Sequence, residues 1–478
     1  MELAECKENR LTIDSISKNG GVLSIEYTVD GEWKKYFSKR RIFNAYYDID
    51  LSDVPDAVAV VPFVGDIIVM ASIFQGKIYL TEIDEDFLNS VPGFIAGFKK
   101  MYPSLDFKAD EIIMAKSIKK SKNQGNKSLL FFSGGVDAYS SLVTHLDEKP
   151  FLLTVWGADI GDNDEITWNG VKRNNIKAAQ ELELPLLFIR SNFRVLLDHE
   201  ELSRIKEAEN SWWHNFHHSV AVISLAAPYA LYYGIRKIYF ASTYTNKDYD
   251  DGAKLASAPF IDNEIRFVSA SVLHDGVEFN RYEKERRIIE YVKASGKKIK
   301  LHVCYQNKDK GENCCKCEKC IRTIIPILLE HEIPQDYGFK NYNKDTVYGD
   351  LVAAIKEKCL SPGSIEAEYG YIQKRFREAY QMDEVPDELK LLYVADLKDI
   401  DKFMNARDIY YERWKELSDW CVELTAGKNW LEEKYNEQNR VIEELKKWNE
   451  ELMAGKNWLE ERYNEQGKII EELKGHLE

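Results

Sequence analysis

Ser133-Gly134-Gly135-Val136-Asp137 is the stretch whose residue types and spacing best suit the chemistry of anions. It follows a short apolar run, 128–132, whose lack of polar alternation predicts a strand buried on both faces. From Ala138 to Leu146 the apolar residues recur at helical spacing. A glycine turn between a strand and a helix lets backbone N–H groups approach an oxyanion closely. The stretch therefore predicts an anion-binding loop, with an ordinary strand-to-helix turn as the alternative.

A cysteine cluster is the second group of residues with the spacing of a functional site. Five of the eight cysteines fall between Cys304 and Cys320. The pattern Cys314-x-x-Cys317-x-x-Cys320, with Cys304 ten residues before Cys314, offers four thiolates for a tetrahedral metal site. We expect these four to hold a structural zinc ion, with a disulfide or redox role and an iron–sulfur cluster as alternatives. Cys315 is the spare thiol and could replace a neighbour as ligand.

Two cations lie near the predicted start of a helix. Arg281 and Lys284 are three residues apart, so they share one helical face. The helix dipole disfavours positive charge at a helix start, so these side chains need a negative partner. Glu278, Glu283 or Glu285 would serve, and the phosphate of a ligand is the other possibility.

The glycine loop resembles the pyrophosphate loop of the ATP pyrophosphatase (PP-loop) superfamily. The resemblance lies in Ser-Gly-Gly-x-Asp after an apolar strand and before a helix that carries Ser140 and Ser141. Members of that superfamily split ATP to AMP and pyrophosphate while they adenylate a substrate. The resemblance implies an adenine nucleotide α-hydrolase-like fold with ATP and Mg²⁺ as cofactors. Ala138 departs from the family pattern, which usually has Ser or Thr at that position.

Together, the loop and the cysteine cluster resemble the 7-cyano-7-deazaguanine synthase family of the queuosine pathway. Cys304-Tyr305, the cysteine triplet that ends at Cys320, and Arg322 match its pattern, whereas Cys315 stands where the family prefers Gly. The resemblance covers about residues 128–330. It implies an ATP-dependent, AMP-forming ligase that adenylates a carboxylate and converts it to a nitrile, amide or amine conjugate, with a small molecule or a protein as the carboxylate substrate.

The candidate site residues follow from this resemblance and from the ends of the predicted strands. Ligands of parallel α/β sheets bind at the carboxyl ends of the strands, which is where Asp159, Ser191 and Thr243 stand. Each of these three also has a plain alternative as a helix cap or turn residue. The candidate catalytic residues are Ser133, Asp137, Arg281 and Lys284. The candidate ATP-binding residues are Ser133, Gly134, Gly135, Val136, Asp137, Tyr139, Ser140, Asp159, Ser191 and Thr243.

His214 and His218 also have the spacing of metal ligands on one helical face, within a helix predicted over about 211–233. No Glu lies between them in the His-Glu-x-x-His arrangement, and three aromatic residues share the run. Core packing or substrate stacking is therefore the preferred interpretation.

The chain divides into four predicted parts. Residues 1–115 predict a β-rich domain for structure or for docking a partner protein, with strands that include 33–37, 57–64 and 66–74 and a helix at 87–101. Residues 125–330 alternate strands and helices, with a strand at 298–303 and a helix from Cys320, which predicts an α/β fold with a parallel sheet. Residues 331–400 predict a helical connector without assigned chemistry.

Residues 402–478 predict a long coiled coil. Seam residues recur at alternating steps of four and three, and the segment 426–433 recurs at 454–461. A helix this long cannot bury its seam against itself, so we expect self-association as a dimer or trimer. Asn449 at a seam position favours the dimer, and an intramolecular hairpin is the alternative.

The amino-acid composition disfavours some classes of function for this protein. The formal net charge of −15 over 478 residues disfavours generic nucleic-acid binding. The charged N-terminus, the lack of an apolar run of roughly 20 residues and the cysteine usage predict a cytoplasmic protein without a membrane span. Two other functions remain open: another PP-loop chemistry, as in sugar amidation or tRNA modification, and a nucleotide-binding scaffold without catalysis.

Overall fold

A computed structural model describes residues 8–208, 211–304, 311–357, 362–381, 384–385, 389–394 and 462–470 of the chain. Contacts divide the chain into two units, Met1–Lys398 and Asp399–Glu478. The predicted coiled coil lies outside the described residues except for the helical segment 462–470. Among the residues searched, no helix is both long and apolar enough to cross a membrane.

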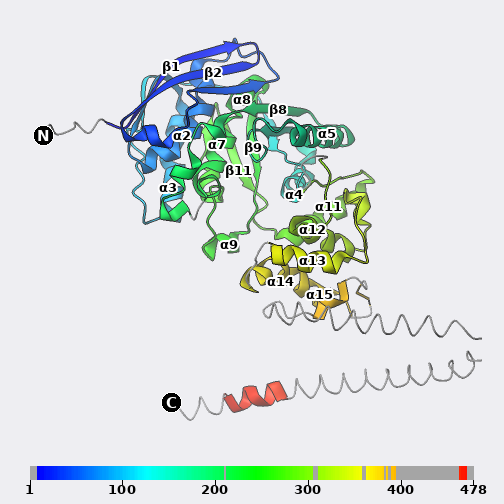
Figure 1. Cartoon of the computed structure of the whole chain (residues 1–478). Helices are drawn as coiled ribbons and strands as arrows, with labels where there is room; N and C mark the ends of the chain where they lie inside the picture. Colours follow the sequence, from blue (N-terminus) through cyan, green and yellow to red (C-terminus); the bar gives the residue numbers. More distant parts are fainter. Residues whose placement is uncertain are drawn as a thin grey trace, which may run out of the picture. The chain divides into compact units, whose positions relative to one another are not determined.

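The first unit is built on one sheet of eleven strands in the order β10-β11-β9-β6-β7-β8-β3-β2-β1-β4-β5 (Figure 1). The strands are β1 (Arg10–Asn19), β2 (Val22–Asp30), β3 (Ile42–Tyr47), β4 (Lys77–Asp84), β5 (Ile113–Lys119), β6 (Lys127–Phe131), β7 (Phe151–Trp156), β8 (Leu186–Ser191), β9 (Ile235–Ala241), β10 (Arg266–Phe267) and β11 (Ala270–Asp275). Six of the ten strand pairings described are parallel. The predicted α/β class with a large, mostly parallel sheet is confirmed.

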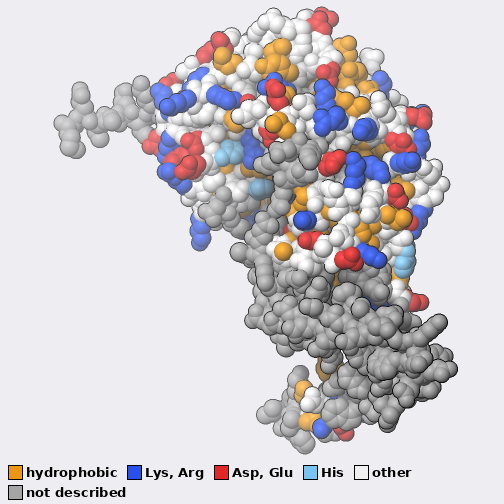
Figure 2. Space-filling view, turned by 45° about the vertical axis from the view of Figure 1, so that its right-hand side comes forward, with side chains coloured by type: hydrophobic (Ala, Val, Ile, Leu, Met, Phe, Trp, Pro, Cys, Tyr) orange, Lys and Arg blue, Asp and Glu red, His pale blue; other side chains and the backbone are white. Residues whose placement is uncertain are grey.

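Helices connect the strands, and a helical group follows them. The helices are α1 (Asp56–Ala59), α2 (Val61–Ile73), α3 (Glu85–Met101), α4 (Val136–Thr144), α5 (Glu165–Leu182), α6 (His199–Leu202), α7 (His218–Ser224), α8 (Ala227–Tyr233), α9 (Asn246–Asp250), α10 (Pro259–Asp262), α11 (Arg281–Ser295), α12 (Glu318–Leu329), α13 (Val347–Glu357), α14 (Pro362–Ala379) and α15 (Lys390–Val394). Figure 1 shows α12 to α15 grouped beside α11. Acidic and basic side chains are interspersed on the face shown in Figure 2.

The strand β6 lies at the centre of the parallel half of the sheet, between β7 and β9. Four of its five residues are buried, as expected of a strand covered on both faces. Because β6, β7 and β9 run parallel, the loops that follow them gather at one edge of the sheet.

The N-terminal strands β1 to β5 form the other half of the same sheet. The two halves join where β3 pairs antiparallel with β8, with Ala45 opposite Ser191 and Tyr47 opposite Ile189. The helix α2 packs against α7 of the other half. The predicted N-terminal part at 1–115 therefore shares a continuous sheet with the part at 125–330.

Three strands predicted in the N-terminal part are wrong. The segments 57–64 and 66–74 fall in α1 and α2, and 33–37 forms mainly a 3₁₀ turn, Gly31–Tyr36. Every residue from Val61 to Ser72 is buried. A helix buried on all sides has no polar face, so its sequence carries no helical period and reads like a buried strand.

Two further elements differ from their predictions. The helix expected over 211–233 is a π-helical turn, Trp213–His217, followed by α7 and α8. The strand expected at 298–303 is an irregular segment. Its backbone partners lie outside the sheet: the Leu301 N–H donates to the Tyr337 carbonyl, and the His302 N–H donates to the Gly134 carbonyl.

The contact between α2 and α7 yields a prediction about stability. A Cβ atom at Gly65 would lie 2.1 Å from Ser224 Oγ and 2.4 Å from Ser224 Cβ. Gly65→Ala should therefore destabilise the protein by about 1–3 kcal/mol, despite the better helix propensity of Ala, because the two helices must separate. Chemical denaturation measures the change. Combining Gly65→Ala with Ser224→Gly should recover part of the loss, and a stable single variant would contradict the packing.

Candidate functional site

The loop after β6 has the strand–glycine–helix geometry that the sequence predicts. Gly134 has a φ of +81°, and a Cβ atom there would lie 2.8 Å from Asn175 Oδ1, so both its conformation and its surroundings require glycine. Gly135 is the N-cap of α4, and its N–H donates to Ser133 Oγ at 3.3 Å. The free N–H groups at the start of α4 therefore lie beside Ser133, which is exposed.

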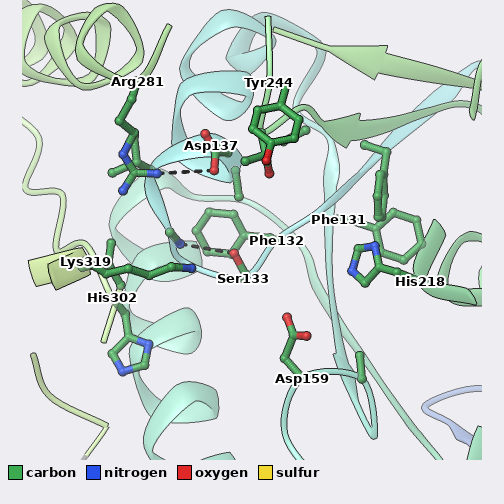
Figure 3. A pocket seen from close by; sticks show the side chains of 18 of the residues that line it. Phe131, Phe132, Ser133, Asp137, Asp159, His218, Tyr244, Arg281, His302 and Lys319 are labelled. Atoms are coloured by element: carbon green, nitrogen blue, oxygen red, sulfur yellow. Dashed lines mark hydrogen bonds and ion pairs between the residues drawn. The ribbon is translucent and has the colours of Figure 1, made fainter. Parts of the chain in front are cut away.

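A cavity of about 1260 Å³ lies at this edge of the sheet (Figure 3). Ser133 and Asp137 from the loop, Asp159 from the segment after β7, and Thr243 from the segment after β9 line it. Arg281 of α11 also lines it. The cavity thus lies at the carboxyl ends of parallel strands, where α/β sheets bind their ligands.

Asp137 and Lys284 form an ion pair at the loop, in which Lys284 is buried and Asp137 is partly exposed. Lys284 Nζ lies 3.3 Å from Asp137 Oδ1 and donates to the Ser242 carbonyl at 2.5 Å, and its side chain is 1 % exposed. Arg281 lies 3.4 Å from the other Asp137 oxygen. Burial works to raise the pKa of Asp137, but the charges of Lys284 and Arg281 outweigh it and hold the pKa below its ordinary value. Asp137 is therefore a carboxylate near neutral pH.

Glu285 is the second carboxyl group on Arg281. The Arg281 Nε–H donates to Glu285 Oε1 at 2.7 Å, and its guanidinium also donates to Thr323 Oγ1 at 3.1 Å. Glu285 is 1 % exposed, and its other oxygen has no hydrogen-bond partner in the described part of the chain. Burial raises the pKa of Glu285 to about 8 although Arg281 acts against the rise. The carboxyl group is therefore largely neutral at pH 7, which leaves the Arg281 charge available to Asp137 and to an anion.

The four predicted cysteine ligands come together. The Sγ atoms of Cys304, Cys314, Cys317 and Cys320 all lie within 4.8 Å of one another. Cys304 and Cys317 are 3.9 Å apart, and Cys314 and Cys320 are 3.8 Å apart. A tetrahedral site with Zn–S bonds of about 2.3 Å places its sulfur atoms about 3.8 Å apart, so two of the sulfur pairs already have the spacing that such an ion requires. Cys315 points elsewhere: its thiol donates to the Asn313 carbonyl at 3.6 Å.

The cysteine cluster also fixes one wall of the cavity. Cys304 lines the cavity, and two residues before it the His302 N–H donates to the Gly134 carbonyl at 2.8 Å. Cys317 is the N-cap of α12, whose second and fifth residues, Lys319 and Arg322, line the cavity as well. A metal ion bound by these cysteines would hold the glycine loop and the start of α12 at fixed positions relative to each other.

The structure brings most of the predicted site residues to the cavity. The lining includes Ser133, Gly135, Val136, Asp137, Asp159, Thr243 and Arg281. Lys284 is paired with Asp137, and the Gly134 carbonyl accepts a hydrogen bond from the N–H of His302, which also lines the cavity.

Three predicted residues lie elsewhere, each with a packing role. Tyr139 is buried against Phe132, with ring centroids 4.9 Å apart. Ser140 is buried, and its carbonyl accepts a hydrogen bond from the Thr144 hydroxyl. The Ser191 hydroxyl is buried and donates to the Asn44 carbonyl at 2.8 Å, where β8 meets β3.

The cavity also holds residues that the sequence analysis did not assign to it. They include His218, His302, Lys319, Arg322 and Tyr371. Lys319 and Arg322 flank Cys320 at a spacing of three on one helix, a signal that the sequence contains. Tyr371 belongs to α14, within the segment 331–400 for which no chemistry was predicted.

His214 and His218 do not act as a pair. The π-helical turn between them changes the face that a spacing of four predicts. His214 is exposed and bonded to Ser211, whereas His218 lines the cavity.

Comparisons with family models, with curated proteins and with solved structures found no match to this chain. The site is therefore interpreted from its own residues.

The cysteine geometry predicts about one tetrahedrally bound metal ion per chain, and loss of one ligand should destabilise the first unit because the binding energy of such a site contributes to folding. Elemental analysis of Cys317→Ser should show loss of the metal. A thermal unfolding experiment on the same variant should show a lower unfolding temperature. Cys315→Ser is the matched control and should keep the metal. Equal metal content in both variants would contradict the assignment.

Proposed function

We propose that the chain is an ATP-dependent, AMP-forming ligase whose first unit contains a PP-loop domain. The observation that carries the proposal is the glycine loop at the start of α4, which opens into a cavity lined by Asp137, Arg281 and Lys319. Backbone N–H groups at a helix start together with convergent cations suit a polyphosphate. The substrate would be a carboxylate of a small molecule or a protein, activated by adenylation.

Each group has a role in this reaction. Ser133 and the N–H groups of the loop bind the pyrophosphate portion of ATP, and Arg281 and Lys319 offset charge that develops on it. The substrate carboxylate attacks the α-phosphorus, and the electron pair of the broken bond leaves on pyrophosphate. Ammonia or an amine then attacks the acyl carbon and displaces AMP. Lys284 keeps Asp137 ionised and in place.

Two metal ions belong to the proposal. Mg²⁺ neutralises polyphosphate charge when bound, and Ser133 and Asp137 offer the oxygen ligands that it prefers. Zinc is the ion proposed for the cysteine cluster, with a structural role. Self-association through residues 402–478 is also proposed, and it would bring two or more such units together.

The loop assignment predicts the effect of two substitutions. Ser133→Ala and Asp137→Asn should each reduce pyrophosphate release by about 10²-fold or more, since both remove groups that face the phosphates. Asn is preferred to Ala at 137 because its amide oxygen can still accept a hydrogen bond from Lys284, which Ala cannot. Pyrophosphate release is measured with the purified protein, ATP and a cell extract that supplies the acceptor substrate. Asp53→Ala, on an exposed turn, is the control, and unchanged release in both site variants would refute the assignment.

The titration of Glu285 predicts a pH dependence of ATP binding. As the pH rises through about 8, Glu285 ionises and offsets the Arg281 charge, so the affinity for Mg·ATP should fall. The ratio of Kd at pH 9 to Kd at pH 7 should be larger in the native protein than in Glu285→Gln, in which this position stays neutral. Calorimetry measures both ratios; equal ratios would show that Glu285 does not modulate the site.

A further inference from the structure

A basic segment interrupts the acidic chain in the N-terminal half of the sheet. The stretch from Trp33 to Tyr47 contains five cations and no acidic residue. The five cations are Lys34, Lys35, Lys39, Arg40 and Arg41, and all of them are exposed. The formal net charge of the whole chain is −15, so residues 34–41 are a local departure from its charge balance. We call residues 34–41 the basic segment.

The charge of the basic segment is only partly neutralised within the molecule. Lys34 lies 3.3 Å from Asp30 and Arg40 lies 2.9 Å from Asp162, and no other described acid is within ion-pair distance of the segment. The Arg41 guanidinium donates to the Ser38 carbonyl at 2.6 Å. Ion pairs between exposed side chains contribute little to stability, so these cations remain available to an external anion.

An exposed apolar and aromatic face continues from the basic segment along β3. Ile42 and Tyr46 are 42 % and 43 % exposed, and they share one face of the strand because side chains alternate. Arg190 of β8 pairs with Tyr46 across the sheet, and its guanidinium lies 5.7 Å from the centre of the Tyr46 ring. Tyrosine and arginine are the side chains that are enriched at the centres of protein interfaces.

Asp162 connects this surface to the loop that lines the cavity. Its Oδ2 atom accepts a hydrogen bond from Arg40 Nη1 at 2.9 Å, and its carbonyl accepts one from Arg190 at 3.0 Å. The four residues before it, 158–161, line the cavity. A molecule bound at Arg40 and Arg190 would therefore lie next to the loop that lines the cavity.

We propose that the basic segment, together with Ile42 and Tyr46, is a docking surface for an acidic segment of a partner protein that also carries apolar side chains. The carboxylates of the partner pair with Lys39 and Arg41, and its apolar side chains pack against Ile42 and Tyr46. The docking needs no nucleotide, so this inference is independent of the proposed function.

The surroundings of the basic segment favour a short acidic protein segment over a nucleic acid. Glu32 and Asp48 are exposed on either side of the run of cations, and Glu26 of β2 lies opposite Ile42 in the sheet. A nucleic acid carries a charge on every phosphate and would extend from the cations onto these carboxylates. A short acidic segment keeps its charge on the cations, and only a protein segment supplies apolar side chains for Ile42 and Tyr46.

Fluorescence anisotropy with the full-length protein tests the docking surface, at about 50 mM salt, where surface charges are less screened than at physiological ionic strength. The first probe is the labelled peptide Glu-Glu-Leu-Glu-Glu-Phe-Glu-Glu, and the second is the same peptide with Gln in place of every Glu. The third probe is a single-stranded oligouridine of about twelve nucleotides. The variants are Lys39→Gln combined with Arg41→Gln, and Tyr46→Ser. Lys116→Gln combined with Arg286→Gln is the matched control, because it removes two exposed cations elsewhere.

The native protein should bind the acidic peptide, and the Gln peptide about tenfold more weakly or less. The double variant should lose about fivefold or more of the affinity for the acidic peptide, and Tyr46→Ser about threefold or more, whereas the control binds as the native protein does. The docking surface is overturned if the native protein does not bind the acidic peptide or if the double variant matches the control. Oligouridine that binds more tightly than the peptide, and loses this affinity in the double variant, would show a nucleic-acid surface and overturn the assignment to a protein partner.

Discussion

The buried positive charge of Lys284 is the constraint on which the site depends. An ammonium group that is 1 % exposed needs fixed oxygen partners, and here these are Asp137 and the Ser242 carbonyl. Asp137 belongs to the first turn of α4 and Ser242 follows β9, so one side chain ties α11 to two strand ends. The α4–α11 packing completes the connection. Removing one partner of such a pair typically costs about 3–5 kcal/mol, so the geometry of the loop and the stability of the domain are coupled.

The cysteine cluster provides the second constraint. It joins the irregular segment before Cys304 to the start of α12. The backbone hydrogen bond from the His302 N–H to the Gly134 carbonyl connects this segment to the glycine loop. The same helix start presents Lys319 and Arg322 to the cavity. Lys319 and Arg322, whose guanidinium forms an ion pair with Glu318, are thus held at fixed positions, an arrangement that favours an anionic ligand without reorganisation.

The parts of the fold and of the site that could be predicted from the sequence are those that short sequence patterns encode. The glycine loop and the group of four cysteines depend on short-range patterns, and the structure contains both features. The sequence of α2 predicts strands because the helix is buried on every side, and a helical period in the sequence requires a polar face. The roles of His218 and Tyr371 depend on a π-helical turn and on the packing of α14, which no local pattern encodes. Ser191 stands at a strand end as predicted, but the neighbouring strand β3 takes its hydroxyl.

The most direct test of the central claim is a crystal structure of the protein with Mg²⁺ and α,β-methylene ATP. The account predicts that the β- and γ-phosphates lie at the start of α4, within hydrogen-bond distance of Ser133 and of the loop N–H groups, with Arg281 turned toward them. A nucleotide bound elsewhere, or an anion-free loop at saturating nucleotide, would contradict it.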